Sequence, residues 1–309
     1  MGILLAIQGA ISQGILWGIM ALGVYVTFRV IDIADLTVDG SFALGGAICA
    51  TMITKGMNPW LSLLVAMAAG VISGVVTGFL YTKCEIPAIL AGILTQIGLY
   101  SINLRIMGRS NTPLLKLGTI FKNISEPTGI DLSWVTMVVG IIFTAVVIAA
   151  LYWFFGTEIG SAVRATGNNE NMVRSLGMNT NTTKTLGLML GNGLIGLSGA
   201  LVTQSQGYAD VKMGTGAIVI GLASIIIGEV IFGQGHSFIV KLFSIAVGSI
   251  IYRIIVAIVL QLGLNTDDLK LLTALLVGVA LSIPVMMERR KQKQSYRASL
   301  GKGDQNADN

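Results

Sequence analysis

The sequence predicts an all-α protein, a polytopic bundle of about nine transmembrane helices. Two observations support this prediction. Of the 309 residues, 53% are hydrophobic and 11% are charged, with a mean hydropathy of +0.79, whereas an ordinary soluble domain has about 25% charged residues. Apolar runs of about twenty residues, which cross a hydrocarbon core of roughly 30 Å, recur along the whole chain. We therefore expect one integral-membrane domain over residues 1–288.

Charged and turn-rich breaks between the apolar runs place the individual spans. The second and seventh spans are interrupted by glycines and polar residues, so we expect broken helices there. Such breaks are tolerated at membrane depth only inside protein or beside a cavity. The nine spans are expected near residues 11–29, 36–54, 60–82, 87–107, 133–155, 186–206, 214–233, 238–260 and 269–287.

Basic residues give the orientation. Six of the twenty lysines and arginines follow the last span, so residues 289–309 are expected to form a basic, disordered cytoplasmic tail. Nine crossings then place the N-terminus outside and the loops after spans 1, 3, 5 and 7 in the cytoplasm. This distribution explains the net charge of +5 without a nucleic-acid partner. Cys49 and Cys84 lack metal-ligand spacing, and neither a disulfide nor a metal site is predicted.

A weak internal repeat links the two halves of the chain. Ala34-Asp35-Leu36 after span 1 resembles Ala209-Asp210-Val211 after span 6, and Gly46 and Gly221 follow at the same offset of twelve residues. The two copies start at opposite membrane surfaces, as expected of an inverted repeat around a central pathway. Chance similarity between two segments rich in Ala and Gly is the alternative.

The cytoplasmic loop over residues 156–185 is predicted to contain a short amphipathic helix. Asn168 or Asn169 can cap its start, and Gly177 can end it. A displayed helix without a core of its own needs a groove on another protein. Packing on its own bundle or on the lipid surface is the alternative. The residues predicted to share its apolar face are Met172, Val173 and Leu176.

The residues of this loop also carry a resemblance to a known family. The stretch from Gly160 to Asn169 (Gly-Ser-Ala-Val-Arg-Ala-Thr-Gly-Asn-Asn), then Leu176-Gly177-Met178 and Leu197-Ser198-Gly199-Ala200-Leu201, resembles the branched-chain amino-acid, ribose and related permease superfamily of ABC importers. The similar stretches cover most of the chain. The resemblance implies a type II ABC importer fold in which this loop is the coupling helix seated on an ATPase. The coupling residues that it implies are Arg164, Ala165, Gly167, Glu170, Met172, Val173, Leu176, Gly177 and Met178.

An early segment bears on the substrate. Residues 31–45 (Ile-Asp-Ile-Ala-Asp-Leu-Thr-Val-Asp-Gly-Ser-Phe-Ala-Leu-Gly) resemble the version typical of aromatic amino-acid (tryptophan or tyrosine) permeases. They depart from the Asn-Phe-Ala-His version of branched-chain amino-acid permeases. The resemblance therefore implies an amino acid as substrate, an aromatic one first, with nucleosides and sugars behind.

The resemblance also implies an assembly in a bacterial cell membrane. The chain would form a homodimer, or pair with a sister permease, and bear two ABC ATPase subunits inside and a substrate-binding lipoprotein or periplasmic protein outside. ATP would bind to the partner ATPase. The chain has no G-x-x-x-x-G-K-[ST] phosphate loop, so we expect a transport subunit that is not an enzyme and holds no cofactor.

Carboxylates near the second span are the first candidates for a translocation pathway, because ionisable groups at depth are costly and usually face a cavity or a partner. Asp32, Asp35 and Asp39 would share one face of a helix at i, i+3 and i+7. The alternative is that Asp32 and Asp35 cap a helix at the membrane interface.

Other polar groups at depth extend this candidate set. Gln96, Tyr100 and Asn103 form an i, i+4, i+7 stripe on span 4, where hydrogen bonding between helices is the alternative role. Glu229 and Arg253 are opposite charges that could pair, in one chain or across a dimer. The candidate pathway residues are Asp35, Asp39, Ser41, Gln96, Asn103 and Asn192.

Two other functions are alternatives to an importer subunit. Gly196-Leu197-Ser198-Gly199 fits the G-x-S-G pattern of an intramembrane serine protease, but Ser198 lies well inside span 6 and the only histidine, His236, lies at a surface turn. A nucleophile and its base must approach within about 3 Å, so no catalytic residue is predicted. An ion-coupled secondary transporter is the better alternative, since inverted repeats and buried carboxylates also suit ion coupling. It gives no role to the displayed helix.

Overall fold

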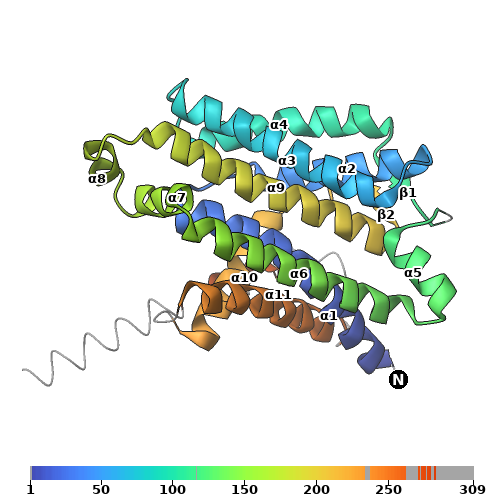
Figure 1. The fold of residues 1–309 in the computed structure, drawn as a ribbon. Coiled ribbons are helices and arrows are strands. Elements are labelled where there is room, and N and C mark those ends of the chain that lie inside the picture. Colours follow the sequence, from blue (N-terminus) through green and yellow to red (C-terminus); the bar gives the residue numbers. More distant parts are fainter. Residues whose placement is uncertain are drawn as a thin grey trace, which may run out of the picture.

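The computed structural model describes residues 2–115, 117–233 and 237–261, with isolated positions between 271 and 282. This part of the chain is a helical bundle with one two-stranded ladder (Figure 1). We name its two ends the α8 end and the strand end, after the elements found there. The elements are α1 (Gly2–Tyr25), the π-helical turn η1 (Val26–Val30), α2 (Val38–Thr54), α3 (Pro59–Thr82), α4 (Ala88–Met107), β1 (Asn111–Pro113), α5 (Ile120–Thr128), α6 (Leu132–Gly156), α7 (Glu158–Asn168), α8 (Glu170–Ser175), α9 (Thr180–Gln206), β2 (Tyr208–Asp210), α10 (Ala217–Phe232) and α11 (Phe238–Gln261).

Eight helical segments overlap the first eight predicted spans. Six are long and apolar enough to cross a membrane, and α2 and α10 are shorter apolar helices. The largest differences are at the starts of α1 and α9, which lie well before the predicted ones. Helix α9 extends beyond its apolar stretch because Asn179 caps it, accepting a hydrogen bond from the Asn181 amide at 3.0 Å. The ninth predicted span lies mostly, and the tail entirely, outside the described residues.

Helices α2 and α10 are shorter than the other spans but continuous, so the prediction of broken helices in the second and seventh spans is wrong. Their glycines pack closely against neighbouring elements without breaking the helix. The two helices contain 17 and 16 residues, and a rise of 1.5 Å per residue makes each about 25 Å long. Residues 31–37 before α2 are not helical, and Asp32 there has a positive φ of 54°. The prediction that three aspartates share one helix face is therefore wrong, because Asp32 and Asp35 precede the helix and Asp39 lies in its first turn.

The packing supports the inverted repeat. Helix α3 packs on α9 as α11 packs on α1, and α2 contacts α3 and α9 as α10 contacts α11 and α1. Leu16 lies beside Ser198 and Gly23 lies beside Gly191, so α1 and α9, which meet at the centre, run in opposite directions. The three-helix units α1–α3 and α9–α11 are thus related by inversion (Figure 1).

The short repeated motif makes the same local turn in both copies. Asp35 Oδ1 accepts a hydrogen bond from the Thr37 amide at 2.8 Å, and Asp210 Oδ1 accepts one from the Lys212 amide at 2.7 Å. An aspartate that bonds the amide two residues on stabilises a turn. The weak sequence similarity therefore corresponds to equivalent turns, each leading toward a short helix.

Glycines let the helices of each unit approach closely. A Cβ atom at Gly70 or Gly74 of α3 would collide with the carbonyl oxygens of Asn192 and Leu188 on α9, and one at Gly248 of α11 would collide with α10. Lipid gives helices no hydrophobic drive to associate, so backbone contact between small residues supplies dispersion energy instead.

The predicted orientation places the loops after spans 1, 3, 5 and 7 on the same side of the membrane. The corresponding helices are α1, α3, α6 and α10, and all four end at the α8 end. Arg29 after α1 forms an ion pair with Glu229 of α10, and the Asn181 side chain donates to the Thr82 carbonyl at the end of α3. Helix α6 leads directly into α7, which contacts η1. These loops therefore share one side of the bundle.

The strand end contains two elements that were not predicted. Strands β1 and β2 pair antiparallel, with Asn111 opposite Asp210. Helix α5 is held to α9 by a hydrogen bond of 2.9 Å from the Ile120 amide to Gln204 Oε1. Both elements lie in connections between spans, where hydropathy carries no signal.

Candidate functional site

A buried hydrogen-bonded network surrounds the start of α2. Asp35 Oδ2 accepts from Asn192 Nδ2 at 2.6 Å, and Asn192 Oδ1 accepts from the Ser41 hydroxyl at 2.6 Å. The Ser41 and Ser73 hydroxyls lie 2.7 Å apart. All four side chains are buried. We call these residues the buried network.

A second chain of hydroxyls continues the buried network toward α4. Thr37 Oγ1 lies 2.7 Å from Thr77 Oγ1, which donates to Thr95 Oγ1 at 3.0 Å. Together these bonds join α2 to α3, α4 and α9. Buried polar groups that are satisfied in this way fix an arrangement of helices.

Asp39 links the two short helices. One carboxylate oxygen accepts from the Gly216 amide at 2.8 Å, and the other accepts from the Ile218 amide at 3.1 Å. These amides belong to the first turn of α10, whose exposed N–H groups and dipole favour a negative charge. A side chain of α2 therefore caps α10, far away in the sequence.

A small polar pocket lies beside Asp39 and has a volume of about 50 Å³. Asn103 is fully buried, and its Nδ2 donates to the Gly40 carbonyl at 3.3 Å. Gln96 is partly exposed and Tyr100 is exposed at this site. The predicted stripe on span 4 thus lies along a single cavity. The residues that line this polar pocket are Asp39, Gly40, Ala43, Gln96, Tyr100, Asn103, Val211 and Thr215.

The six predicted pathway residues therefore divide into two groups. Asp35, Ser41 and Asn192 belong to the buried network, and the others belong to the polar pocket. Sequence reasoning missed the hydroxyl partners, of which Ser73 and Thr77 are four residues apart on α3 and so share a face. The other three pathway residues are Asp39, Gln96 and Asn103.

Helix α8 is held by a cap and two ion pairs. Asn169 Oδ1 accepts from the Met172 amide at 3.0 Å, as one predicted alternative requires. Glu170 contacts Lys184 at 2.7 Å and Arg174 at 2.8 Å. The hydrogen bond from Lys184 lowers the pKa of Glu170 below its usual value. Gly177 follows the helix with a φ of +83°, which favours glycine.

Apolar side chains of this segment are displayed at the α8 end. Met172 is 47% exposed, Leu176 72% and Met178 44%. Val173 is buried, so the prediction that it shares an outward face with Met172 and Leu176 is wrong. It anchors α8 to the bundle instead.

The remaining residues predicted to contact an ATPase lie on α7. Arg164 stacks on the ring of Phe238, with 4.8 Å from Cζ to the ring centroid. Ala165 is half-buried, and a side chain at Gly167 would collide with the Val30 carbonyl. Gly167 thus allows close packing of α7 on η1.

Comparison with known proteins decides the family. The family described as "Branched-chain amino acid transport system / permease component" matches residues 6–282. The chain belongs to this permease family. It is 40% identical over 271 residues to a "Tyrosine transport system permease protein" of Clostridioides difficile (strain R20291), which covers 88% of each chain.

More distant relatives of the permease transport other solutes or are uncharacterised. An uncharacterised protein of Rickettsia prowazekii (strain Madrid E) is 32% identical over 88% of this chain and 95% of its own. A ribose import permease protein of Escherichia coli (strain K12) is 26% identical over 89% of this chain and 82% of its own. No solved structure matches the permease.

The charged residues of spans 7 and 8 are not paired with each other in the permease. Glu229 pairs with Arg29, and the guanidinium of Arg253 stacks over Trp17, with 4.0 Å from Cζ to the ring centroid. The predicted pairing of Glu229 with Arg253 in one chain is therefore wrong. Cation–π stacking stabilises the partly buried guanidinium instead.

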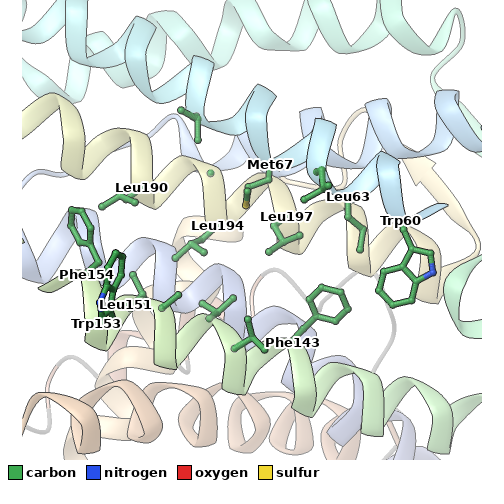
Figure 2. A pocket seen from close by; sticks show the side chains of 16 residues that line it. Trp60, Leu63, Met67, Phe143, Leu151, Trp153, Phe154, Leu190, Leu194 and Leu197 are labelled. Atoms are coloured by element: carbon green, nitrogen blue, oxygen red, sulfur yellow. The ribbon is translucent and has the colours of Figure 1, made fainter. Parts of the chain in front are cut away.

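A lateral groove of about 600 Å³ opens between α3, α6 and α9 of the permease (Figure 2). Apolar and aromatic side chains line it, with Trp60 and Phe143 toward one end and Trp153 toward the other. An amino acid or sugar would find almost no hydrogen-bond partner there, and burying its polar groups would be costly. This groove suits apolar chains and is not a candidate for solute recognition.

Ser198 has a structural role in the permease. Its buried hydroxyl donates to the Leu16 carbonyl at 2.8 Å and so links α9 to α1. Hydrogen bonds of this kind hold membrane helices together. His236, the base considered in the protease hypothesis, lies outside the described residues.

Proposed function

We propose that the chain is the membrane-spanning subunit of an ATP-driven, binding-protein-dependent importer and forms its translocation pathway. The display of Met172, Leu176 and Met178 at the α8 end is the observation on which this proposal rests. Three exposed apolar side chains on a rigidly held segment fit a groove on a partner protein. The Glu170–Lys184 ion pair joins the segment to α9, so force on α8 is transmitted to α9 through Lys184. The Asn169 cap and the Glu170–Arg174 pair stabilise α8 itself.

The proposed orientation places the α8 end in the cytoplasm. The basic tail and the positive-inside rule support this choice. The strand end, with β1, β2 and α5, would then meet an extracellular or periplasmic binding protein. Two copies of the chain, or this chain and a sister permease, would enclose the pathway, and the partner ATPases would bind ATP.

The proposed substrate is an amino acid, with aromatic amino acids first. The relative named as a tyrosine transport permease supports this choice, because it is 40% identical over nearly the whole chain. Residues 31–45 resemble the segment of aromatic amino-acid permeases. These residues form the connection into α2 and the first turns of that helix, next to both the buried network and the polar pocket.

Co-purification from native membranes in mild detergent tests the proposed assembly. We expect a P-loop ATPase and a substrate-binding lipoprotein or periplasmic protein to accompany the chain. Leu176→Asp should lose the ATPase, while Leu176→Met, which keeps an apolar side chain, should retain it. A chain that emerges without an ATPase, yet takes up solute along a proton or sodium gradient, would establish the ion-coupled alternative.

A further inference from the structure

Asn103, which lines the polar pocket, has a buried acceptor without a partner. The amide nitrogen of Asn103 donates to the Gly40 carbonyl, and only the nitrogen of an Asn side chain can do so. The other polar atom of this amide, Oδ1, has no hydrogen-bond partner among the described residues. Buried polar atoms left in this state are rare in folded proteins and require an explanation.

The charge of the pocket is negative. Asp39 is the only charged side chain among the described residues that line it. A carboxylate has about four acceptor positions, and the α10 amides use two of them. The helix terminus offsets roughly half an elementary charge. Negative charge and free acceptor positions therefore remain for a donor in the pocket.

We propose that the polar pocket binds a primary ammonium group, the α-ammonium of an amino-acid substrate. An ammonium has three N–H donors and no acceptor, which complements Asp39 and Asn103 Oδ1. The volume of about 50 Å³ is sufficient, since one water needs about 10–15 Å³. The proposal deepens the proposed function, on which its substrate depends.

The mouth of the pocket explains how a larger molecule would bind. Gln96 and Tyr100 line the pocket but remain partly or largely exposed, and Thr215 is exposed on the other side. Only the ammonium group would enter, while the rest of the substrate would lie outside against the ring of Tyr100. Aromatic faces also attract cations.

A tethered ammonium tests the chemistry of the pocket without transport. Asn103→Lys places an ammonium at this site, and Asn103→Met places a neutral chain of similar length there. We expect the Lys variant to melt at or above the temperature of wild type in detergent, and the Met variant to melt lower by roughly 2–4 °C. A pocket that only holds water would disfavour a buried cation. A Lys variant that melts below the Met variant would overturn the proposal.

Uptake tests the role of the pocket in transport. The permease, its ATPase and its binding protein are reconstituted in proteoliposomes with L-tyrosine as the probe. Asn103→Met, Asn103→Lys and Gln96→Leu should each lower ATP-driven uptake at least tenfold with the ATPase still bound. Ile102→Met, an exposed position on the same helix, should have no effect.

Failure of the ammonium site and failure of the proposed importer function give different results. Uptake that stays at the wild-type level in Asn103→Met would overturn the ammonium site and leave the importer function intact. A wild-type complex without ATP-driven uptake would overturn the proposed function, and the melting comparison would still decide whether the pocket prefers a cation.

Discussion

Asn192 shows how a single side chain can fix the start of a membrane helix. It donates to Asp35 and accepts from Ser41, so it contacts residues on both sides of the α2 start. Helix α2 begins inside the bundle, where water is excluded and each backbone or side-chain polar group must bond to protein. The amide supplies one donor and one acceptor at the place where both are needed.

Asn192→Leu should therefore destabilise the permease. The Asp35 carboxylate and the Ser41 hydroxyl would each lose a buried partner, at a cost of about 1–3 kcal/mol or more. Thermal melting of the purified protein measures the loss. Ser224→Ala is the matched control, because the Ser224 hydroxyl is buried but bonds within its own helix, to the Ile220 carbonyl. Equal melting temperatures for the two variants would contradict this role of the buried network.

Glu170 gives α8 a pH-dependent attachment. The hydrogen bond from Lys184 lowers the pKa of Glu170 from its ordinary 4.5. A carboxyl with a lowered pKa stabilises the folded state above its ordinary pKa, and this stabilisation is lost as pH falls through the lowered value. The melting temperature of wild type should exceed that of Glu170→Gln at neutral pH, and the difference should vanish in acid.

The control for this measurement is Glu158→Gln at the start of α7. Glu158 is exposed and forms none of the ion pairs found among the described residues. Its substitution should change the melting temperature little at any pH. A difference between wild type and Glu170→Gln that persists unchanged in acid would show that the ion pairs do not stabilise α8.

Among single residues, the acids and amides of the site can be predicted from sequence better than its hydroxyls. Asp39 and Asn103 stand out because charged groups and amides are rare inside membrane spans. Ser73 and Thr95 do not stand out, since a hydroxyl can bond within its own helix and only the packed structure reveals a second partner. Val173 was assigned to the wrong side because helical periodicity does not say which face meets the bundle.

Close contacts between helices of the bundle depend on glycines, which have no side chain. Gly74→Leu in α3 should prevent stable packing, because its Cβ would collide with the Leu188 carbonyl, and backbone atoms cannot rotate away. Overpacking of this kind costs roughly 1–3 kcal/mol or more. Gly98→Leu in α4 is the control, because a Cβ there meets nothing within 4 Å.

The yield of monodisperse protein after detergent extraction measures this effect. Gly74→Leu should give much less folded protein than wild type, and Gly98→Leu should give the wild-type amount. Equal yields from both variants would mean that α3 and α9 can separate without cost, contrary to the observed packing.

Elements that cross the membrane are predictable from sequence because lipid imposes both length and composition on them. The eight overlapping spans follow from this constraint. Helix α5 and the ladder of β1 and β2 were missed because connections outside lipid obey no such rule. The turn η1 was also missed, since a π-helical turn depends on packing against neighbouring elements.

Across the whole molecule, two inverted three-helix units meet at α1 and α9, and their short helices are joined by Asp39. This carboxylate on α2 caps α10, while α10 ends beside Glu229 and Arg29 at the α8 end. A continuous set of contacts therefore runs from the polar pocket to the α8 end. The sequence suggested the repeat through only a few residues, because the two units share a fold and a turn but few side chains.

Uptake of L-tyrosine by proteoliposomes tests the importer function most directly. The vesicles would contain the permease, its ATPase and its binding protein. ATP would be enclosed in the compartment that the α8 end faces. Uptake should require ATP hydrolysis and persist when proton and sodium gradients are collapsed, and Leu176→Asp should abolish it while Leu176→Met does not. Uptake that follows an ion gradient and ignores ATP would contradict the proposed function.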